Sequence, residues 1–287
     1  MFGFLNIYKP VGMTSFDIVA RLRKISKVRQ IGHTGTLDPF AEGVLPVCFG
    51  KATKLIEYLS SDKAYLATVQ FGAKTDTYDL DGKILENFNK IVSENDVETG
   101  LKIFEGDIEQ YPPIYSAIKV NGKKLYEYAR AKESVDIQPR KVKIYKIELR
   151  EFNSKEQTAQ IYIECSKGTY IRSIANDLGV ELACGGYLTK LIRIKSGNFS
   201  VESSLKLDNI QSIEDINKNL LNPKDYIDLP YYELNDDECV RVSHGMAIKN
   251  KDFDSDEVVI LLYGDKIYAT GVADRDKILV KKVFGVL

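Results

Sequence analysis

Residues 32–46 read GHTGTLDPFAEGVLP, a stretch crowded with glycine, proline and small polar residues. This composition is too irregular for a helix and too long for a simple turn, so we expect an ordered loop that continues to Gly50. Long ordered loops are usually functional. The stretch holds the carboxylate of Asp38 between the apolar Leu37 and the rigid Pro39. It is therefore the first place to look for chemistry.

Familiar nucleotide and metal motifs do not explain this stretch. Gly50-Lys51 lacks both the earlier glycine and the following hydroxyl residue of a P-loop. The segment at 79–82 resembles a calcium loop but lacks the first and twelfth ligands. The chain has only two histidines and four cysteines, and no C-x-x-C pair occurs, so a zinc site or disulfide framework has little support. We expect no metal, and reduced thiols.

The bulk composition predicts a soluble cytoplasmic protein. At 287 residues the chain predicts one large and one small domain, and no apolar run approaches the roughly eighteen residues that cross a bilayer. The N-terminus lacks the features of a secretory signal. The net charge is −1, yet residues 119–146 hold nine Lys or Arg against three acids. This basic segment is equally compatible with an RNA-binding surface and with a solvated face.

Local patterns predict strands and helices on either side of the loop. Thr14 and Ser15 offer the N-cap of a helix that ends near Lys27, and Asn121-Gly122 is a strong hairpin signal. We expect Gly168-Thr169 to cap a helix that carries Arg172 in its first turn. Further helices are expected near 52–60, 94–104, 212–220 and Cys239. Alternation predicts strands at 2–8, 63–72, 141–149, 158–165, 188–201, 257–263, 267–273 and 278–284.

The loop closely resembles the signature of the TruB-type family of tRNA pseudouridine synthases. That signature is GHTG-x-LDP followed by A-x-G-x-LP, and the match continues through GKATK at 50–54. The resemblance spans roughly residues 3–200. Other family-like segments follow in the expected order: LNIYKPVGMTS (5–15), KAY (63–65), TDTYD (75–79), YPPIYSA (111–117) and CSKGTYIRS (165–173).

The resemblance implies an α+β fold, the pseudouridine synthase fold. Its core is a large mixed, mainly antiparallel sheet with flanking helices, and the active cleft crosses the middle of the sheet. Residues 1–227 would form the catalytic domain, with an RNA-gripping insertion at about 119–146. Residues 228–287 look like a small β-rich PUA-type RNA-binding domain, although no sharp motif supports that part.

The resemblance also implies a reaction and its catalytic residues. The T-loop uridine of tRNA, position 55, would be isomerised to pseudouridine without a cofactor. Asp38 could stabilise the sugar cation, trap it covalently or remove the 2′ proton, and the sequence does not say which. By resemblance Arg172 is its ion-pair partner, Tyr65 is the tyrosine that stacks on the uracil and assists loss of the C5 proton, and Leu191 is an apolar wall over the base.

RNA binding would involve a second set of residues. A uridine stacked in the T-loop must be extruded before it can react, and by resemblance His33 is the wedge that braces the gap. Lys9, Lys54 and the basic segment 119–146 would contact phosphates. We expect the T-arm of tRNA as the partner, and a monomer without an obligate protein partner.

Two other functions share these features. A non-catalytic RNA-binding or tRNA-folding protein could use the same wedge, insertion and tail. An RNA glycosidase would use the same carboxylate and release free uracil. The presence of Asp38, Tyr65 and Arg172 together favours catalysis, because binding alone does not require that trio.

Overall fold

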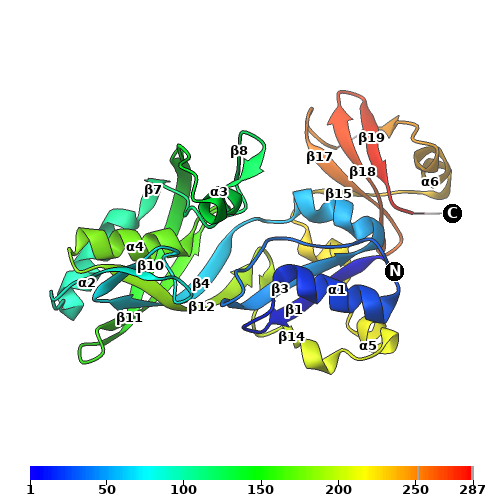
Figure 1. Ribbon diagram of the computed structural model, residues 1–287. Coiled ribbons are helices and arrows are strands. Elements are labelled where there is room, and N and C mark those ends of the chain that lie inside the picture. The colour runs from blue at the N-terminus through cyan, green and yellow to red at the C-terminus, as the bar shows by residue number, and fades with distance from the viewer. Residues whose placement is uncertain (251, 286–287) are drawn as a thin grey trace.

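The computed structural model describes residues 1–250 and 252–285. Its larger part is one sheet of ten strands flanked by helices, and a sheet of five strands follows it (Figure 1). The large sheet has the order β14 (Leu205–Lys206), β1 (Gly3–Lys9), β3 (Glu42–Phe49), β12 (Gly186–Ser196), β4 (Lys63–Phe71), β11 (Thr158–Cys165), β10 (Arg140–Asn153) and β7 (Gly106–Gln110), with β2 (Ile31–His33) beside β3 and β13 (Phe199–Ser200) beside β12.

Only two of the pairings in this sheet are parallel, β1 with β14 and β3 with β12. The expected mixed, mainly antiparallel sheet is therefore confirmed. Figure 1 shows β4 and β12 crossing the middle of the molecule between two groups of helices. On one side lie α2 (Glu94–Leu101) and α4 (Ile171–Glu181), and on the other α1 (Ser15–Ser26) and α5 (Ile213–Lys218).

The two groups of helices cover two separate hydrophobic cores. Ile18 and Leu22 of α1 pack with Leu5 and Leu45 of the sheet in one core. Ile174 of α4 belongs to the other, together with residues of β4 and β11.

Short elements complete the large domain. Two hairpins lie outside the large sheet, β5 (Ala73–Thr75) with β6 (Ile84–Asn87) and β8 (Lys119–Val120) with β9 (Lys123–Lys124). Helix α3 (Leu125–Ala131) follows the second hairpin. The 3-10 helices are η1 (Gly50–Tyr58), η2 (Lys102–Phe104), η3 (Leu207–Asn209) and η4 (Pro223–Tyr226).

Most capping and turn signals are confirmed. The Thr14 side chain accepts from the Asp17 amide and the Asp17 carboxylate accepts from the Thr14 amide, so α1 opens with a complete capping box and ends at the left-handed Lys27. Asn121 and Gly122 have φ of 51° and 82°, as a tight hairpin turn between β8 and β9 requires.

One expected cap is wrong. The N-cap of α4 is Tyr170 and not Gly168-Thr169, because the Thr169 hydroxyl donates to the carbonyl of Ser166, 3.0 Å away, and so closes its own turn. Arg172 nevertheless lies in the first turn of the helix, as expected.

The expectation of one long loop from 32 to 50 is also wrong, because β2 and β3 occupy both ends of that stretch. Only residues 34–41 are irregular. Strand β3 lies between β1 and β12, and its residues from Gly43 to Phe49 are all buried. A strand buried on both faces has no apolar-polar alternation, and Gly43 and Pro46 further hide it.

Gly43 lets β3 approach β12 closely. Its φ is +108°, and a Cβ placed there would lie 2.3 Å from the carbonyl oxygen of Arg193, its register partner in β12. Any side chain at this position would strain the backbone and push the two strands apart. The register that brings loop 34–41 over β12 therefore depends on this glycine.

We predict that Gly43→Ala lowers the free energy of unfolding by about 3 kcal/mol or more, because it adds a backbone clash to the strain of positive φ. Urea unfolding measures this loss. Gly106→Ala is the matched control, since Gly106 has φ of +92° and no atom within 4 Å of the added Cβ. It should cost only about 1 kcal/mol. Equal costs for the two variants would contradict the close approach.

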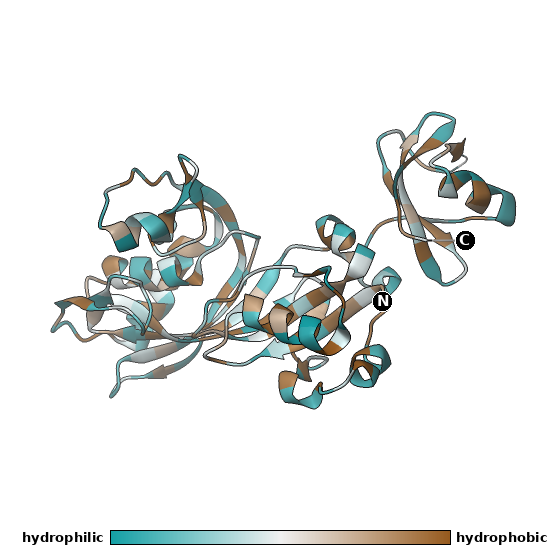
Figure 2. Cartoon of the chain, turned by 45° about the vertical axis from the view of Figure 1, so that its right-hand side comes forward, coloured by the Kyte–Doolittle hydropathy of each residue, from teal (hydrophilic) through white to brown (hydrophobic). Residues whose placement is uncertain are grey.

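The last part of the chain forms the five-stranded sheet, in the order β15 (Tyr231–Glu233), β17 (Val258–Tyr263), β18 (Lys266–Asp274), β19 (Lys277–Val283) and β16 (Ile248–Lys249). Helix α6 (Asp236–Ser243) packs on it, and Figure 2 shows the sheet at one end of the large domain. Ile260 and Leu262 of β17 share a hydrophobic core with Phe4 of β1. The Lys51 ammonium donates to the Phe284 carbonyl at 3.0 Å, and the Phe284 ring lies 5.7 Å from that of Phe2. None of the helices described is long and apolar enough to span a membrane.

Candidate active site

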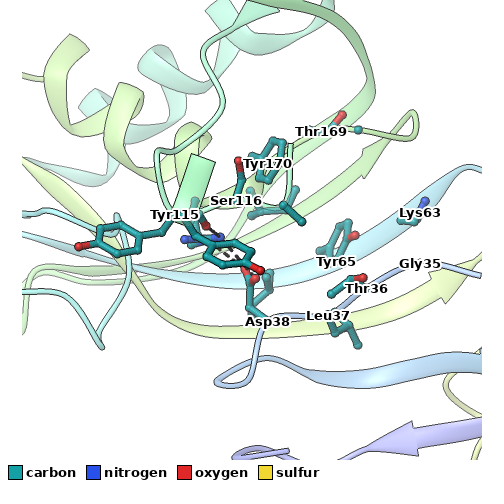
Figure 3. A pocket seen from close by; sticks show the side chains of 16 residues that line it. Gly35, Thr36, Leu37, Asp38, Lys63, Tyr65, Tyr115, Ser116, Thr169 and Tyr170 are labelled. Carbon is teal, nitrogen blue, oxygen red and sulfur yellow. Dashed lines mark hydrogen bonds and ion pairs between the residues drawn. The ribbon is translucent and has the colours of Figure 1, made fainter. Parts of the chain in front are cut away.

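A cavity of about 400 Å³ opens above the central strands of the large sheet. Figure 3 shows Asp38 projecting from loop 34–41, Tyr65 beside it, and Ser116 and Tyr170 above. The loop, β4, β12, the start of α4 and the segments that lead into β8 and α3 all contribute side chains. The lining residues are Gly35, Thr36, Leu37, Asp38, Lys63, Tyr65, Tyr115, Ser116, Ala117, Tyr126, Gly168, Thr169, Tyr170, Ile171, Arg172 and Leu191.

Asp38 and Arg172 meet at the floor of this cavity. The Arg172 Nε lies 2.9 Å from Asp38 Oδ2, and the aligned hydrogen bond runs from Nη2 to Oδ1 over 3.3 Å. The arginine side chain is 5% exposed, whereas the aspartate side chain is 35% exposed. The cation is thus held inside the protein, while its carboxylate partner faces the cavity.

A second carboxylate, Asp79, shares the same guanidinium. Arg172 Nη1 lies 3.3 Å from Asp79 Oδ2, and its remaining donors reach the carbonyls of Thr77 at 3.1 Å and Tyr115 at 3.0 Å. Burial raises the pKa of Asp79, and a 2.6 Å hydrogen bond from the Thr77 hydroxyl opposes that rise together with the Arg172 cation. Arg172 is therefore fixed from several sides before any substrate arrives.

Sequence reasoning missed Asp79 as a site residue, although the TDTYD segment contained it. It also missed Tyr170, which lines the cavity two residues before Arg172. The Tyr170 amide donates to the Gln110 side chain at 2.7 Å, and burial raises the pKa of its phenol. The available signal for both residues was their place inside family-like segments.

Tyr65 and Leu191 lie where the sequence placed them, on the central strands under the cavity. Tyr65 in β4 is 6% exposed and Leu191 in β12 is 5% exposed, and both line the cavity. Burial raises the pKa of Tyr65 to about 12, although the neighbouring Arg193 guanidinium acts in the opposite direction. A phenol with this pKa stays protonated near neutrality.

His33 and Lys54 lie outside the lining of the cavity. His33 ends β2, two residues before Gly35, and its Nδ1 is buried without a hydrogen-bond partner among the residues described. Burial lowers its pKa, and the Arg193 charge lowers it further. Lys54 is exposed on η1. The positions of His33 and Lys54 neither support nor contradict the RNA contacts expected of these residues.

Lys9 is not available to phosphates, so that expectation is wrong. Its side chain is fully buried, and its ammonium donates to the carbonyls of Pro10 at 2.9 Å, Met13 at 2.6 Å and Pro39 at 3.3 Å. Burial lowers its pKa to about 8. Lys9 therefore ties the end of β1 to the residue that follows Asp38.

We predict that Lys9→Met destabilises the fold by about 2 kcal/mol or more, because it leaves three carbonyls without their shared donor. It should leave the salt dependence of RNA binding unchanged. Urea unfolding and binding titrations at several salt concentrations measure the two effects. The control, Lys54→Met, alters an exposed lysine and should not change stability. A weaker salt dependence of RNA binding in Lys9→Met would show that Lys9 does contact a phosphate.

Comparison with known proteins now places this geometry in a family. A model of the N-terminal domain of TruB family pseudouridylate synthases matches residues 23–171. The chain belongs to the TruB family of pseudouridylate synthases. The match covers the Asp38 loop and Tyr65 but ends just before Arg172.

Individual members of the TruB family align with nearly the whole chain. tRNA pseudouridine synthase B of Carboxydothermus hydrogenoformans is 44% identical over 291 residues, which cover 99% of each chain. The enzyme of the same name from Clostridium kluyveri is 42% identical over 274 residues, 94% of this chain and 93% of that protein. A chain of a solved H/ACA RNP bound to a substrate RNA containing 2′-deoxyuridine is 25% identical, with a TM-score of 0.73, and the alignment covers 99% of this chain and 86% of that one. These likenesses confirm the expected family and fold.

Proposed function

We propose that this TruB-family protein isomerises the T-loop uridine of tRNA, position 55, to pseudouridine. The observation that carries the proposal is the Asp38–Arg172 pair on the floor of a cavity that also holds Tyr65. The names of its relatives support tRNA as the substrate. A protein that only binds RNA has no need for a carboxylate and a buried guanidinium aligned in this way.

The reaction breaks one bond and forms another. The C1′–N1 bond breaks, the uracil leaves with the bonding electrons and turns, and its C5 then bonds to C1′. The C5 proton is lost and N1 gains a proton, so atoms and charge balance without redox change. No cofactor is needed for this sequence of steps.

Asp38 acts on the sugar in this proposal. Its carboxylate faces the cavity while Arg172 holds it from the protein side, so it can approach C1′ or the 2′ position of a nucleotide in the cavity. There it stabilises positive charge on the sugar, forms a covalent bond to C1′ or accepts the 2′ proton. Arg172 keeps the carboxylate oriented towards the cavity in all three routes.

Tyr65 and Leu191 act on the base. In the register of β4 and β12, Tyr65 pairs with Arg193 and Ala67 pairs with Leu191. Because alternate residues of a strand face the same side of a sheet, Tyr65 and Leu191 lie on the same face. The phenol ring stacks on the uracil and assists loss of the C5 proton, and the leucine covers the base. While these two side chains hold the turning base, water does not reach the sugar. The base therefore rejoins the sugar and is not released as free uracil.

RNA recognition requires a surface around the cavity. We infer that His33 braces the stack after the uridine has been extruded, and that Lys54 and segment 119–146 contact phosphates. Figure 1 shows α3 and β8 of that segment standing over the sheet, and Tyr126 of α3 lines the cavity. Residues 228–287 act as a PUA-like RNA-binding domain after a catalytic domain at 1–227. The protein works in the cytoplasm as a monomer without an obligate protein partner.

We predict that Asp38→Asn lowers the rate of pseudouridine formation on an unmodified tRNA transcript by about 10³-fold or more, because the amide cannot carry the required negative charge. Mass-labelling of pseudouridine detects the product, and a filter-binding titration should show nearly unchanged tRNA affinity. Asp107→Asn, at an exposed position on β7, is the control. Full turnover by Asp38→Asn would remove Asp38 from the reaction, and release of free uracil by the unaltered protein would establish a glycosidase instead.

We predict that Lys119→Ala with Lys132→Ala weakens tRNA binding mainly at low salt. Both lysines are exposed, and neither takes part in an ion pair among the residues described. The slope of log affinity against log salt concentration is negative, and losing two phosphate contacts should reduce its magnitude by about 1 to 2. Lys90→Ala with Lys155→Ala removes two exposed lysines outside segment 119–146 and is the charge-matched control. A loss of affinity that does not depend on salt would argue against phosphate contacts by this segment.

A further inference from the structure

Arg193 is the largest side chain that is fully buried in the described chain. It lies on β12 directly opposite Tyr65 of β4 and opposite Gly43 of β3. The ion pairs found among residues 1–250 and 252–285 include none to this arginine. A guanidinium does not lose its proton in proteins, and burying it without a carboxylate is costly. Such a residue requires an explanation beyond filling space.

The donors of Arg193 all point at backbone carbonyls around the Asp38 loop. Nη2 donates to Gly35 at 3.0 Å, Nη1 donates to Thr36 at 3.4 Å, and Nε donates to Val44 at 2.7 Å. Gly35 and Thr36 come shortly before Asp38 in the loop, and Val44 lies in the strand that follows it. The planar fork of one guanidinium therefore bridges the two ends of the loop.

The same charge lies beside the groups that line the cavity floor. It opposes the effect of burial on the pKa of Tyr65, and the other charged or titratable groups that act on that phenol are Cys165 and Asp38. It also contributes to the lowered pKa of Lys63, which lines the cavity. Because Arg193 has no exposed surface, it can act on a bound nucleotide only through the loop and through Tyr65.

We propose that Arg193 is a positioning residue for the isomerisation, which holds the Gly35–Thr36 segment so that Asp38 meets Arg172, and which keeps a fixed positive charge behind Tyr65. This inference rests on the proposed function. After the C1′–N1 bond breaks, the detached uracil carries negative charge, and a fixed cation behind the ring on which it stacks stabilises that charge while the base turns. Arg193 would therefore affect the chemical step and not the capture of tRNA.

The test compares single-turnover pseudouridine formation with tRNA affinity. Arg193→Lys keeps the charge but replaces the fork by a single ammonium, so it should slow the single-turnover rate about 10- to 100-fold through displacement of Asp38. The Kd for tRNA should stay within about threefold, and circular dichroism should show a folded protein. Arg193→Met removes the charge as well and should be slower still. Arg150→Lys, an arginine at the surface of β10, is the matched control and should match the unaltered protein.

The outcomes separate this inference from the proposed function. A rate within twofold of the unaltered protein in Arg193→Lys would overturn the positioning role. A rate that falls only in proportion to the amount of folded protein, or to the affinity for tRNA, would make Arg193 a purely structural residue. That result would overturn the positioning role as well. If Arg193→Met does not fold, Arg193→Lys decides alone. Absence of pseudouridine with the unaltered protein would instead overturn the proposed function, and this inference with it.

Discussion

The ion pair between Asp38 and Arg172 joins two parts of the chain that are 134 residues apart in sequence. One partner comes from an irregular loop between two strands, and the other from the first turn of a helix on the opposite side of the cavity. The pair is asymmetric, since the cation is buried and the anion faces solvent. Every functional proposal for this protein depends on that asymmetry, because it directs one charged oxygen pair towards whatever enters the cavity.

Three buried cations surround the loop that carries Asp38. Lys9 binds the Pro39 carbonyl, Arg193 binds the carbonyls of Gly35 and Thr36, and Arg172 binds the Asp38 carboxylate. An irregular loop has no ladder of backbone hydrogen bonds, so its buried carbonyls need other donors. Here charged side chains supply them. The arrangement that stabilises the loop thus also places the Arg193 cation opposite Tyr65, which suits a base that leaves as an anion.

Local features of this fold could be predicted from the sequence, whereas features created by tertiary contacts could not. The capping box at Thr14 and the turn at Asn121 depend only on near neighbours, and both are confirmed. Strand β3 escaped detection because burial on both faces removes the alternation that marks a strand, and Gly43 is there for a contact with a distant strand.

The same distinction holds for the site. Family-like segments located Asp38, Arg172 and Tyr65, the resemblance to the family implied Leu191, and all four line the cavity. Lys9 was misplaced because a sequence does not reveal which lysine is buried. Asp79 and Tyr170 stand inside family-like segments, but their importance, like that of Arg193, comes from the atoms they contact across the fold.

The most direct test is a crystal structure of the protein bound to a T-arm RNA with 5-fluorouridine at position 55. We predict that this nucleotide lies outside the RNA stack and inside the cavity, with its C1′ beside the Asp38 carboxylate and its base on Tyr65, while Arg172 still holds the aspartate. A target nucleotide that remains stacked in the RNA, or that binds away from the Asp38–Arg172 pair, would contradict the account.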